Sequence, residues 1–253
     1  MPTFNIEDHL IIPFGYTQKK EIYRVHLLSV GPGGVWLQSQ TPAVHIQRNT
    51  KQPLTFQQFN STFGVKHFPA ETSIQESWSA ANTIIQGLIP SPTVHENQFL
   101  EAYFDYIWED YNYTADAFEE NEDKIPQFAL FNALLPIPQA WFYVHDPLKQ
   151  TPWSNISFPV DCYRVDFAFW DGLQLYAIEI DGNKPNFAYH IERDRRLRSS
   201  GIEVIHILNS ELAKHKWVAV QQLLPIKLKR HWAETDVDPP TTNPLTSVFY
   251  GHD

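Results

Sequence analysis

Short apolar segments separated by turn residues form the pattern of the second half of the chain. They are rich in aromatic and β-branched residues, as expected of strands, and cover 140–145, 163–170, 173–181 and 202–208. A helix is predicted over 189–200, where Gly201 stops it. Strands followed by a crossover helix and one more strand predict an α/β fold with a mixed central β-sheet flanked by helices.

The first 88 residues have a less regular pattern, in which short β segments are the main signal. Segments 23–29 and 34–38 flank the sequence Gly-Pro-Gly-Gly at 31–34, which is typical of a hairpin connection. The periodicity then becomes helical, over 73–87 and again from about Pro92 onward. We therefore expect an N-terminal region (1–88) for substrate recognition or partner docking, a core (89–235) and a loose C-terminal tail (236–253).

Residues 105–123 carry eight acidic side chains and no lysine or arginine. The simplest interpretation is a solvated helix end followed by a loop. The alternative is an acidic flap that competes with an anionic ligand for a nearby site.

Two acidic residues stand inside the apolar strands of the core. The Asp-Gly sequence at 171–172 predicts a two-residue hairpin turn. In that register Arg164 faces Glu179, while Asp166 and Glu179 are diagonal neighbours on one face, with Cα atoms roughly 7–8 Å apart. Carboxylates in such surroundings are costly unless they are compensated. A salt bridge between Arg164 and Glu179 is one explanation, and a divalent cation such as Mg²⁺ or Mn²⁺ is the other.

Five segments in this part of the chain form a larger pattern. They read YRVDFAF (163–169), AIEIDG (177–182), YH (189–190), RDRRL (193–197) and GIEVIHI (201–207). In order and spacing they resemble the core of PD-(D/E)XK nucleases, which have a restriction-endonuclease-like fold, and among these the very-short-patch-repair-type endonucleases. Residues 91–100 resemble the first helix of the family, and Pro138-Gln139 its entry into a strand. The resemblance covers roughly residues 91–215.

The resemblance implies a metal site. Asp166 and Glu179 match the metal-binding pair of the family, and the carbonyl of Ile180 matches a third ligand. Glu96 matches the acid of the first helix, with Glu101 as the second choice. An ordinary solvent-exposed glutamate remains the alternative for either.

The chain departs from the family two residues after Glu179, at Asp181. Asp181 stands where the family usually has the catalytic lysine, as in the very-short-patch-like branch. Lys184 or His190 would then assist proton transfer or hold the phosphate, unless His190 is an ordinary helix-cap or surface imidazole. Gln139 would orient the water or contact a ligand such as the nucleic acid, and an ordinary glutamine at the strand edge is the alternative.

Positive charge is concentrated next to the expected site. Residues 184–231 hold ten lysines and arginines against four acidic residues, a local net charge of +6, although the chain as a whole carries −10. The expected nucleic-acid contacts are Arg193, Arg195, Arg196 and Arg198. Alternatively, the arginines of this helix pair with Glu192 and Asp194.

Composition limits the other possibilities. A single cysteine excludes a disulfide framework and a cysteine-rich zinc site. The chain shows no apolar run of about 18 residues, no signal-peptide pattern and no glycine-rich phosphate loop, so we expect a cytoplasmic protein that uses no ATP. The negative net charge argues against a general nucleic-acid coat protein.

These features predict a metal-dependent endonuclease that hydrolyses phosphodiester bonds, with DNA as the expected substrate and Mg²⁺ as the cofactor, for which Mn²⁺ substitutes. The resemblance implies a role in genome defence, mobile elements or repair. The alternative is a non-catalytic nucleic-acid-binding or assembly subunit with a degenerate nuclease fold. A protein partner or a homodimer stays open, and no membrane partner is expected.

Overall fold

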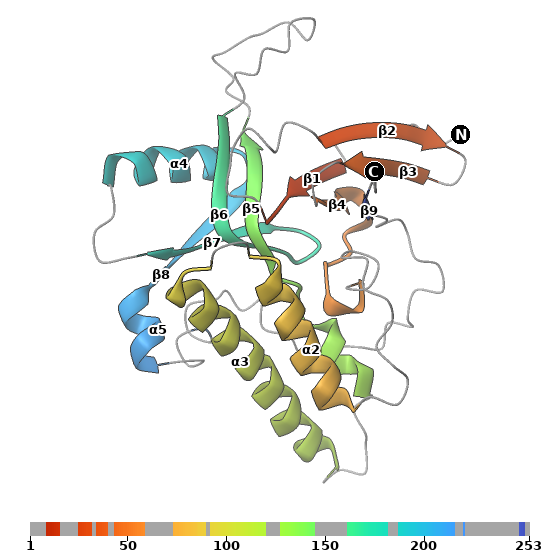
Figure 1. The fold of residues 1–253 in the computed structure, drawn as a ribbon, viewed down its shortest axis with the longest axis vertical. Coiled ribbons are helices and arrows are strands. Elements are labelled where there is room, and N and C mark those ends of the chain that lie inside the picture. Colours follow the sequence, from red (N-terminus) through yellow and green to blue (C-terminus); the bar gives the residue numbers. More distant parts are fainter. Residues whose placement is uncertain are drawn as a thin grey trace, which may run out of the picture.

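The computed structural model (Figure 1) describes residues 9–15, 25–31, 34–39, 43–58, 73–89, 92–119, 127–144, 161–181, 187–215, 220 and 248–250. Its elements form a mixed α/β fold around a four-stranded sheet, which confirms the expected class. No helix in the described part of the chain combines the length and apolar character that crossing a bilayer requires.

The central sheet has the strand order β5–β6–β7–β8. Its strands are β5 (Ile137–Val144), β6 (Asp161–Trp170), β7 (Leu175–Asp181) and β8 (Ile202–Leu208). β6 is antiparallel to β5 and to β7, whereas β8 is parallel to β7. A parallel neighbour needs a crossover, which α4 (Phe187–Ser199) provides. The four predicted strands and the predicted crossover helix are confirmed, with ends that differ by a few residues.

Helices lie on both sides of this sheet. α2 (Ile74–Gly87) and α3 (Val94–Glu119) pack side by side on one side, and α4 lies on the other (Figure 1). α5 (Asn209–His215) follows β8 and contacts α3. The described ranges also include three short 3₁₀ helices: η3 (Arg48–Thr50), η4 (Phe56–Gln58) and η5 (Gln127–Asn132).

Aromatic side chains from α3 fill the core on its side of the sheet. The ring centroids of Phe99 and Phe167 are 4.8 Å apart, and those of Tyr103 and Phe169 are 5.3 Å apart. The Tyr103 hydroxyl donates a hydrogen bond of 2.7 Å to the Leu134 carbonyl, so that this buried polar group keeps a hydrogen-bond partner. This packing holds the start of α3 against β5 and β6.

The N-terminal region forms two small sheets. β1 (His9–Pro13) pairs with β4 (Ala43–Gln47). β2 (Val25–Gly31) and β3 (Gly34–Ser39) form the predicted hairpin, and β9 (Val248–Tyr250) joins β3 in parallel. The part of the expected loose tail that β9 covers is therefore a paired strand.

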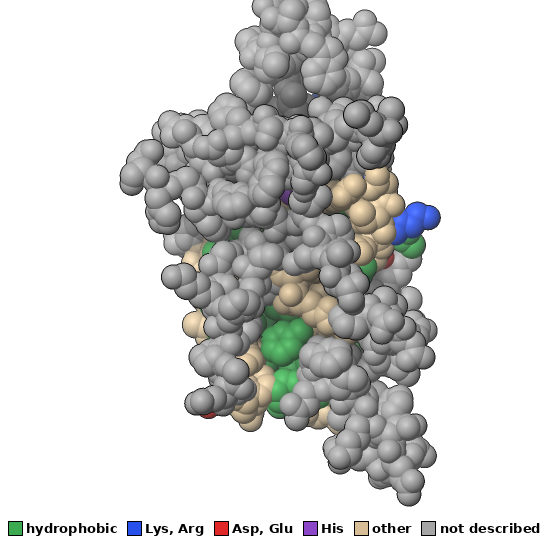
Figure 2. All heavy atoms as spheres, turned by 90° about the vertical axis from the view of Figure 1, so that its right-hand side faces the viewer, with side chains coloured by type: hydrophobic (Ala, Val, Ile, Leu, Met, Phe, Trp, Pro, Cys, Tyr) green, Lys and Arg blue, Asp and Glu red, His purple; other side chains and the backbone are tan. Residues whose placement is uncertain are grey.

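β1, β4, η4 and α2 share one hydrophobic core with the sheet. Backbone hydrogen bonds cross the expected boundary at residue 88: the Leu54 N–H donates to the Trp170 carbonyl at 3.0 Å, and the Phe56 N–H donates to the Ala133 carbonyl at 3.0 Å. Figure 2 shows the side where α2 and η5 lie in Figure 1, and described hydrophobic side chains gather in its lower half. The boundary at 88 thus does not separate two cores.

The turn between β6 and β7 differs from the prediction. Trp170 pairs with Leu175, so the connection has four residues rather than two. The carboxylate of Asp171 shapes it, because Asp171 Oδ1 accepts hydrogen bonds from the Leu173 and Gln174 N–H groups at 2.8 and 2.6 Å. The register shifts by two residues, and an even shift leaves each side chain on its predicted face.

Substitution of Gly172 tests this turn. Gly172 has φ of +95°, and a Cβ there would lie 2.2 Å from the Lys51 carbonyl oxygen. We expect Gly172→Ala to lower the free energy of unfolding by roughly 2–4 kcal/mol, because strain and a backbone clash add. Urea denaturation measures the loss.

Two other glycines separate these causes. Gly201 has φ of +79° but open space around its Cβ position, so Gly201→Ala should cost about 1 kcal/mol. Gly87 has neither constraint, so Gly87→Ala should change stability by less than about 0.5 kcal/mol. Equal losses at all three positions would contradict the proposed close contact at Gly172.

Candidate active site on the central sheet

Four polar side chains form a row that crosses the sheet from β5 to β8. The backbone pairs that flank Gln139 in the β5–β6 ladder place Gln139 opposite Asp166 of β6. Asp166 lies opposite Glu179 of β7, one residue beyond the last pair of that ladder. Glu179 pairs with His206 of β8. The two predicted carboxylates therefore do meet on one face, as direct rather than diagonal neighbours.

Glu96 joins the row from the start of α3. It is 3% exposed and belongs to a capping box, in which its N–H donates to Thr93 Oγ1 at 3.1 Å and its Oε2 accepts from the Thr93 N–H at 2.6 Å. Its other oxygen, Oε1, accepts from Gln139 Nε2 at 3.1 Å. The expected first-helix acid is thus buried at the site, whereas Glu101 is exposed. The exposed-glutamate alternative for Glu96 is wrong.

Gln139 has an unusual backbone. Its φ is +46°, in the left-handed region that residues other than glycine rarely adopt, and its side chain is 2% exposed. Its Nε2 is bonded to Glu96, while its Oε1 is buried without a hydrogen-bond partner. Gln139 is therefore not part of the exposed surface, and its expected contact with nucleic acid stays a prediction. Strain and an unsatisfied acceptor make Gln139 a candidate for contact with a ligand in the site.

Asp166 has an altered acidity. Its Oδ2 accepts the Ile180 N–H at 2.8 Å. Burial raises the pKa of the Asp166 carboxyl to about 6, and the negative charge of Glu96 adds to the rise, while the Ile180 hydrogen bond opposes it. Ile180 thus contacts the pair through its N–H, and its carbonyl as a ligand remains a prediction.

Glu179 is held by an arginine from α4. Its Oε2 lies 3.0 Å from Nη1 of Arg193, and both residues are buried. Burial and the Asp166 charge raise the pKa of the Glu179 carboxyl well above its ordinary value, while Arg193 acts in the opposite direction. The predicted salt bridge with Arg164 is therefore wrong, because Arg193 is the arginine that reaches Glu179. The second oxygen, Oε1, is buried without a hydrogen-bond partner.

A chain of charged contacts links Glu179 to Asp181 through α4 and β8. Arg193 Nη2 lies 3.3 Å from Asp194 Oδ1. Asp194 Oδ2 lies 2.6 Å from His206 Nε2, and His206 Nδ1 lies 2.5 Å from Asp181 Oδ2. Ionised carboxylates only accept, so both contacts are hydrogen bonds when each ring nitrogen carries a hydrogen. Asp181 is thereby fixed beside the row.

Sequence reasoning missed His206 and treated Asp194 only as a partner for surface arginines. The available signal was a lone histidine between apolar residues of the strand that follows Gly201. Its partners could not be recognised, because they come from another strand and from a helix. Of the residues expected to assist, Lys184 lies outside the described residues. His190 is half-buried on α4, one helical turn before Arg193 and Asp194.

The basic surface is smaller than expected. Arg193 is 5% exposed and belongs to the interior. Arg195 and Arg196 both bind Glu192, at 2.8 and 2.6 Å, and their hydrogen bonds lower the pKa of the Glu192 carboxyl to about 2. Arg198 is more than half exposed and lies 3.9 Å from Asp194 Oδ2. The pairing of helix arginines with Glu192 and Asp194 is therefore present, and Arg195 and Arg198 stay accessible.

The donors at the row are of the kind that a hard cation prefers. The row offers carboxylate and amide oxygens, and the Oε1 atoms of Glu179 and Gln139 lack hydrogen-bond partners. In the described ranges, no three acidic, histidine or cysteine side chains are grouped closely enough to hold an ion by themselves. The residues fit Mg²⁺ when Gln139, a backbone carbonyl or water completes the ligand set, because Mg²⁺ usually keeps several waters.

Comparison with known proteins gives no independent assignment. No protein family, no curated protein and no solved structure matches the chain. The geometry of the site is therefore the ground for a functional proposal.

The raised pKa of Asp166 predicts a pH-dependent cost in stability. Between the ordinary value of 3.8 and the folded value of about 6, the folded state keeps a proton that the unfolded state releases, so stability falls as pH rises through this range. Asp166→Asn removes the ionisable group and keeps an oxygen for the Ile180 N–H. In chelator at about pH 8 the variant should be more stable than the wild type by on the order of 2 kcal/mol.

Urea denaturation from about pH 4 to pH 8 measures this difference. The advantage of Asp166→Asn should shrink toward the acidic end. Glu203→Gln, at an exposed position of β8, removes the same charge and should show no such trend. An advantage that stays constant across the range would show that the Asp166 carboxyl is not perturbed.

Proposed function

We propose that this protein is a metal-dependent endonuclease with a restriction-endonuclease-like core that hydrolyses phosphodiester bonds, with DNA as the substrate. The observation that supports this most is the row of Gln139, Asp166 and Glu179, beside the buried Glu96. Burial raises the pKa of the Asp166 and Glu179 carboxyls, and a neighbouring acid adds to each rise, which costs stability and is typical of functional sites. A cation beside them removes this cost.

Asp166 and Glu179 would hold the Mg²⁺ ion, with the Ile180 carbonyl and Gln139 Oε1 as further oxygens. A bound Mg²⁺ supplies positive charge for the phosphoryl oxygens and lowers the pKa of a coordinated water. In hydrolysis, a water oxygen bonds to phosphorus, the bond to one ester oxygen breaks, and that oxygen takes up a proton.

Residues of the chain hold this arrangement in position. Arg193 favours the ionised form of Glu179. It contacts Oε2, so Glu179 Oε1 remains without a hydrogen-bond partner. Glu96 accepts the hydrogen bond from Gln139 Nε2 and so fixes the orientation of the amide. The acceptor oxygen of the amide, Oε1, then points away from Glu96. The contacts of His206 fix Asp181 at the position where the resembled family has lysine. Positioning of this kind is a large part of catalysis at a phosphate.

The exposed side of α4 supplies the contact surface for nucleic acid. Arg195 and Arg198 have side chains 70% and 55% exposed, so backbone phosphates can reach both. Their Glu192 and Asp194 neighbours reduce the local charge, which favours modest, salt-sensitive affinity.

A non-catalytic binding or assembly subunit is the second candidate. The ion pair of Arg193 with Glu179 favours it, because this pair compensates one carboxylate without a metal. Binding of Mn²⁺ separates the two candidates. Calorimetric titration that shows Mn²⁺ binding lost in Asp166→Asn supports the enzyme, and no binding to the wild type supports the subunit.

Substitution of the two carboxylates tests cleavage. With Mg²⁺, Asp166→Asn and Glu179→Gln should each lower the cleavage rate at least about a hundredfold, because several kcal/mol of charge stabilisation is lost. The assay uses single-stranded, duplex and branched DNA and RNA, with Mg²⁺, Mn²⁺ or chelator. Glu203→Gln should cleave at the wild-type rate, and full activity in both site variants would remove the pair from the mechanism.

Substitution of the exposed arginines tests substrate binding. In the Asp166→Asn background, Arg195→Ala and Arg198→Ala should weaken binding of duplex DNA and reduce the salt slope by about one per lost phosphate contact. Arg48→Ala, at an exposed arginine in η3, is the matched control and should have no effect. Fluorescence anisotropy at several salt concentrations gives both quantities, and equal affinities would exclude α4 as the contact surface.

A further inference from the structure

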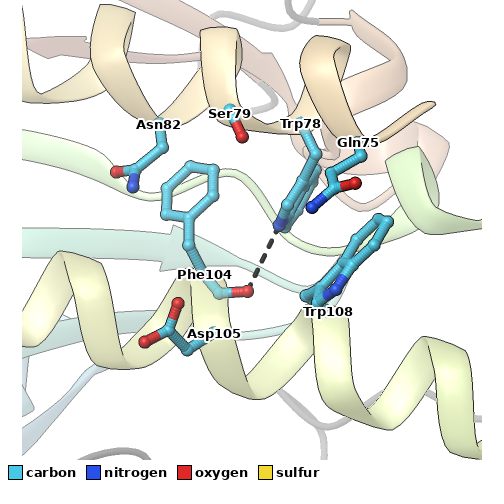
Figure 3. Close-up of a pocket in the computed structure, with 7 residues that line it drawn as sticks. All are labelled: Gln75, Trp78, Ser79, Asn82, Phe104, Asp105 and Trp108. Carbon is cyan, nitrogen blue, oxygen red and sulfur yellow. Dashed lines mark hydrogen bonds between the residues drawn. The ribbon is translucent and has the colours of Figure 1, made fainter. Parts of the chain in front are cut away.

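A pocket of about 170 Å³ lies between α2 and α3, away from the acidic row (Figure 3). α2 contributes Gln75, Trp78, Ser79 and Asn82, and α3 contributes Phe104, Asp105 and Trp108. The helices form the layer on the side of the sheet opposite α4 (Figure 1). This pocket therefore plays no part in the cleavage site proposed above.

Aromatic rings form the rigid part of the pocket. The ring centroids of Trp78 and Phe104 are 4.8 Å apart, and Trp78 Nε1 donates to the Phe104 carbonyl at 3.2 Å, which joins the two helices (Figure 3). Both side chains are buried, so the half-buried Trp108 is the ring that an occupant of the pocket can reach. The face of a tryptophan ring attracts cations.

The polar groups of the pocket favour a hydrogen-bond donor. Figure 3 shows the Asp105 carboxylate on the α3 side of the opening, facing the Asn82 amide from α2. Among the residues that the structure describes, Asn82 Oδ1 has no hydrogen-bond partner, and no cationic side chain lines the pocket. An ionised carboxylate accepts and does not donate, so the group that best complements this pocket carries positive charge and several N–H donors.

The surroundings add to this preference. The sequences of α2 and α3 contain no lysine or arginine. Glu101, Asp105 and Glu109 are exposed at four-residue spacing and form an acidic ridge along α3 beside the pocket. This charge repels the phosphates of nucleic acid and attracts a basic peptide.

The size of the pocket limits the occupant. Sites for small molecules and cofactors usually measure roughly 300–1,000 Å³, so 170 Å³ suits one inserted side chain. Arginine matches it, because its planar guanidinium stacks on aromatic faces and carries five donors. We propose that the α2–α3 pocket is a docking site for a partner protein, in which an arginine of a basic segment inserts between the helices and the segment follows the acidic ridge.

Short peptides test this docking site. The probe is a glycine-serine peptide with two arginines, and the matched probe carries citrulline, an uncharged isostere, in their place. Titrated to millimolar concentration, the arginine peptide should shift the indole N–H signals of Trp78 and Trp108 in a ¹⁵N–¹H NMR spectrum, and the citrulline peptide should not. Trp108→Phe assigns one of these signals.

Asp105→Asn should weaken binding of the arginine peptide about tenfold, because one charge-assisted contact is lost. Asp105 is exposed, so the variant is expected to fold. Glu203→Gln lowers the net negative charge equally, outside the pocket, and should bind like the wild type. The proposal fails if citrulline binds as well as arginine, if Asp105→Asn has no effect, or if duplex DNA shifts the same signals.

Discussion

The buried contact between Arg193 and Glu179 is the interaction on which the arrangement of the site depends. Glu179 and Asp166 are neighbours on one face of the sheet. Burial raises the pKa of both carboxyls, and the charge of Glu96 adds to the rise at Asp166 as that of Asp166 does at Glu179. Arg193 reaches them from α4 and opposes that rise. The same guanidinium contacts Asp194, the next residue of α4, which binds His206, so these two residues together connect the crossover helix to β7 and β8. Removal of such a partner leaves an uncompensated buried charge, which commonly costs 3–5 kcal/mol.

Charge is divided between the two sides of the sheet. α4 carries exposed arginines, whereas α3 carries the exposed acidic ridge and no basic residue. A nucleic acid would be drawn to the first surface and repelled by the second, since both effects follow from the sign of the phosphate charge. The proposed peptide-docking pocket lies on the acidic side, so a basic partner and a nucleic acid could bind without competing for one surface.

The turn at Asp171 shows why the prediction of the acidic pair held although its register did not. The Asp-Gly sequence favoured a two-residue turn, but the Asp171 carboxylate accepts hydrogen bonds from two later N–H groups and so closes a longer turn. The longer turn shifts the strand register by two residues. An even shift leaves the alternation of side chains unchanged, so Asp166 and Glu179 remain on one face. A shift by one residue would have moved one of them to the apolar face.

Local patterns in the sequence by themselves determined the strands of the sheet, the crossover helix, the approximate starts of α2 and α3, and the shared face of Asp166 and Glu179. These features depend on periodicity, caps and stops within a few residues of each other. Only the tertiary structure decided that Glu179 binds Arg193 rather than Arg164, that Glu96 is buried against Gln139, and that His206 bridges Asp181 and Asp194. These contacts depend on how a helix is rotated and placed against the sheet, which is decided by packing of the whole core and leaves no signature in local spacing.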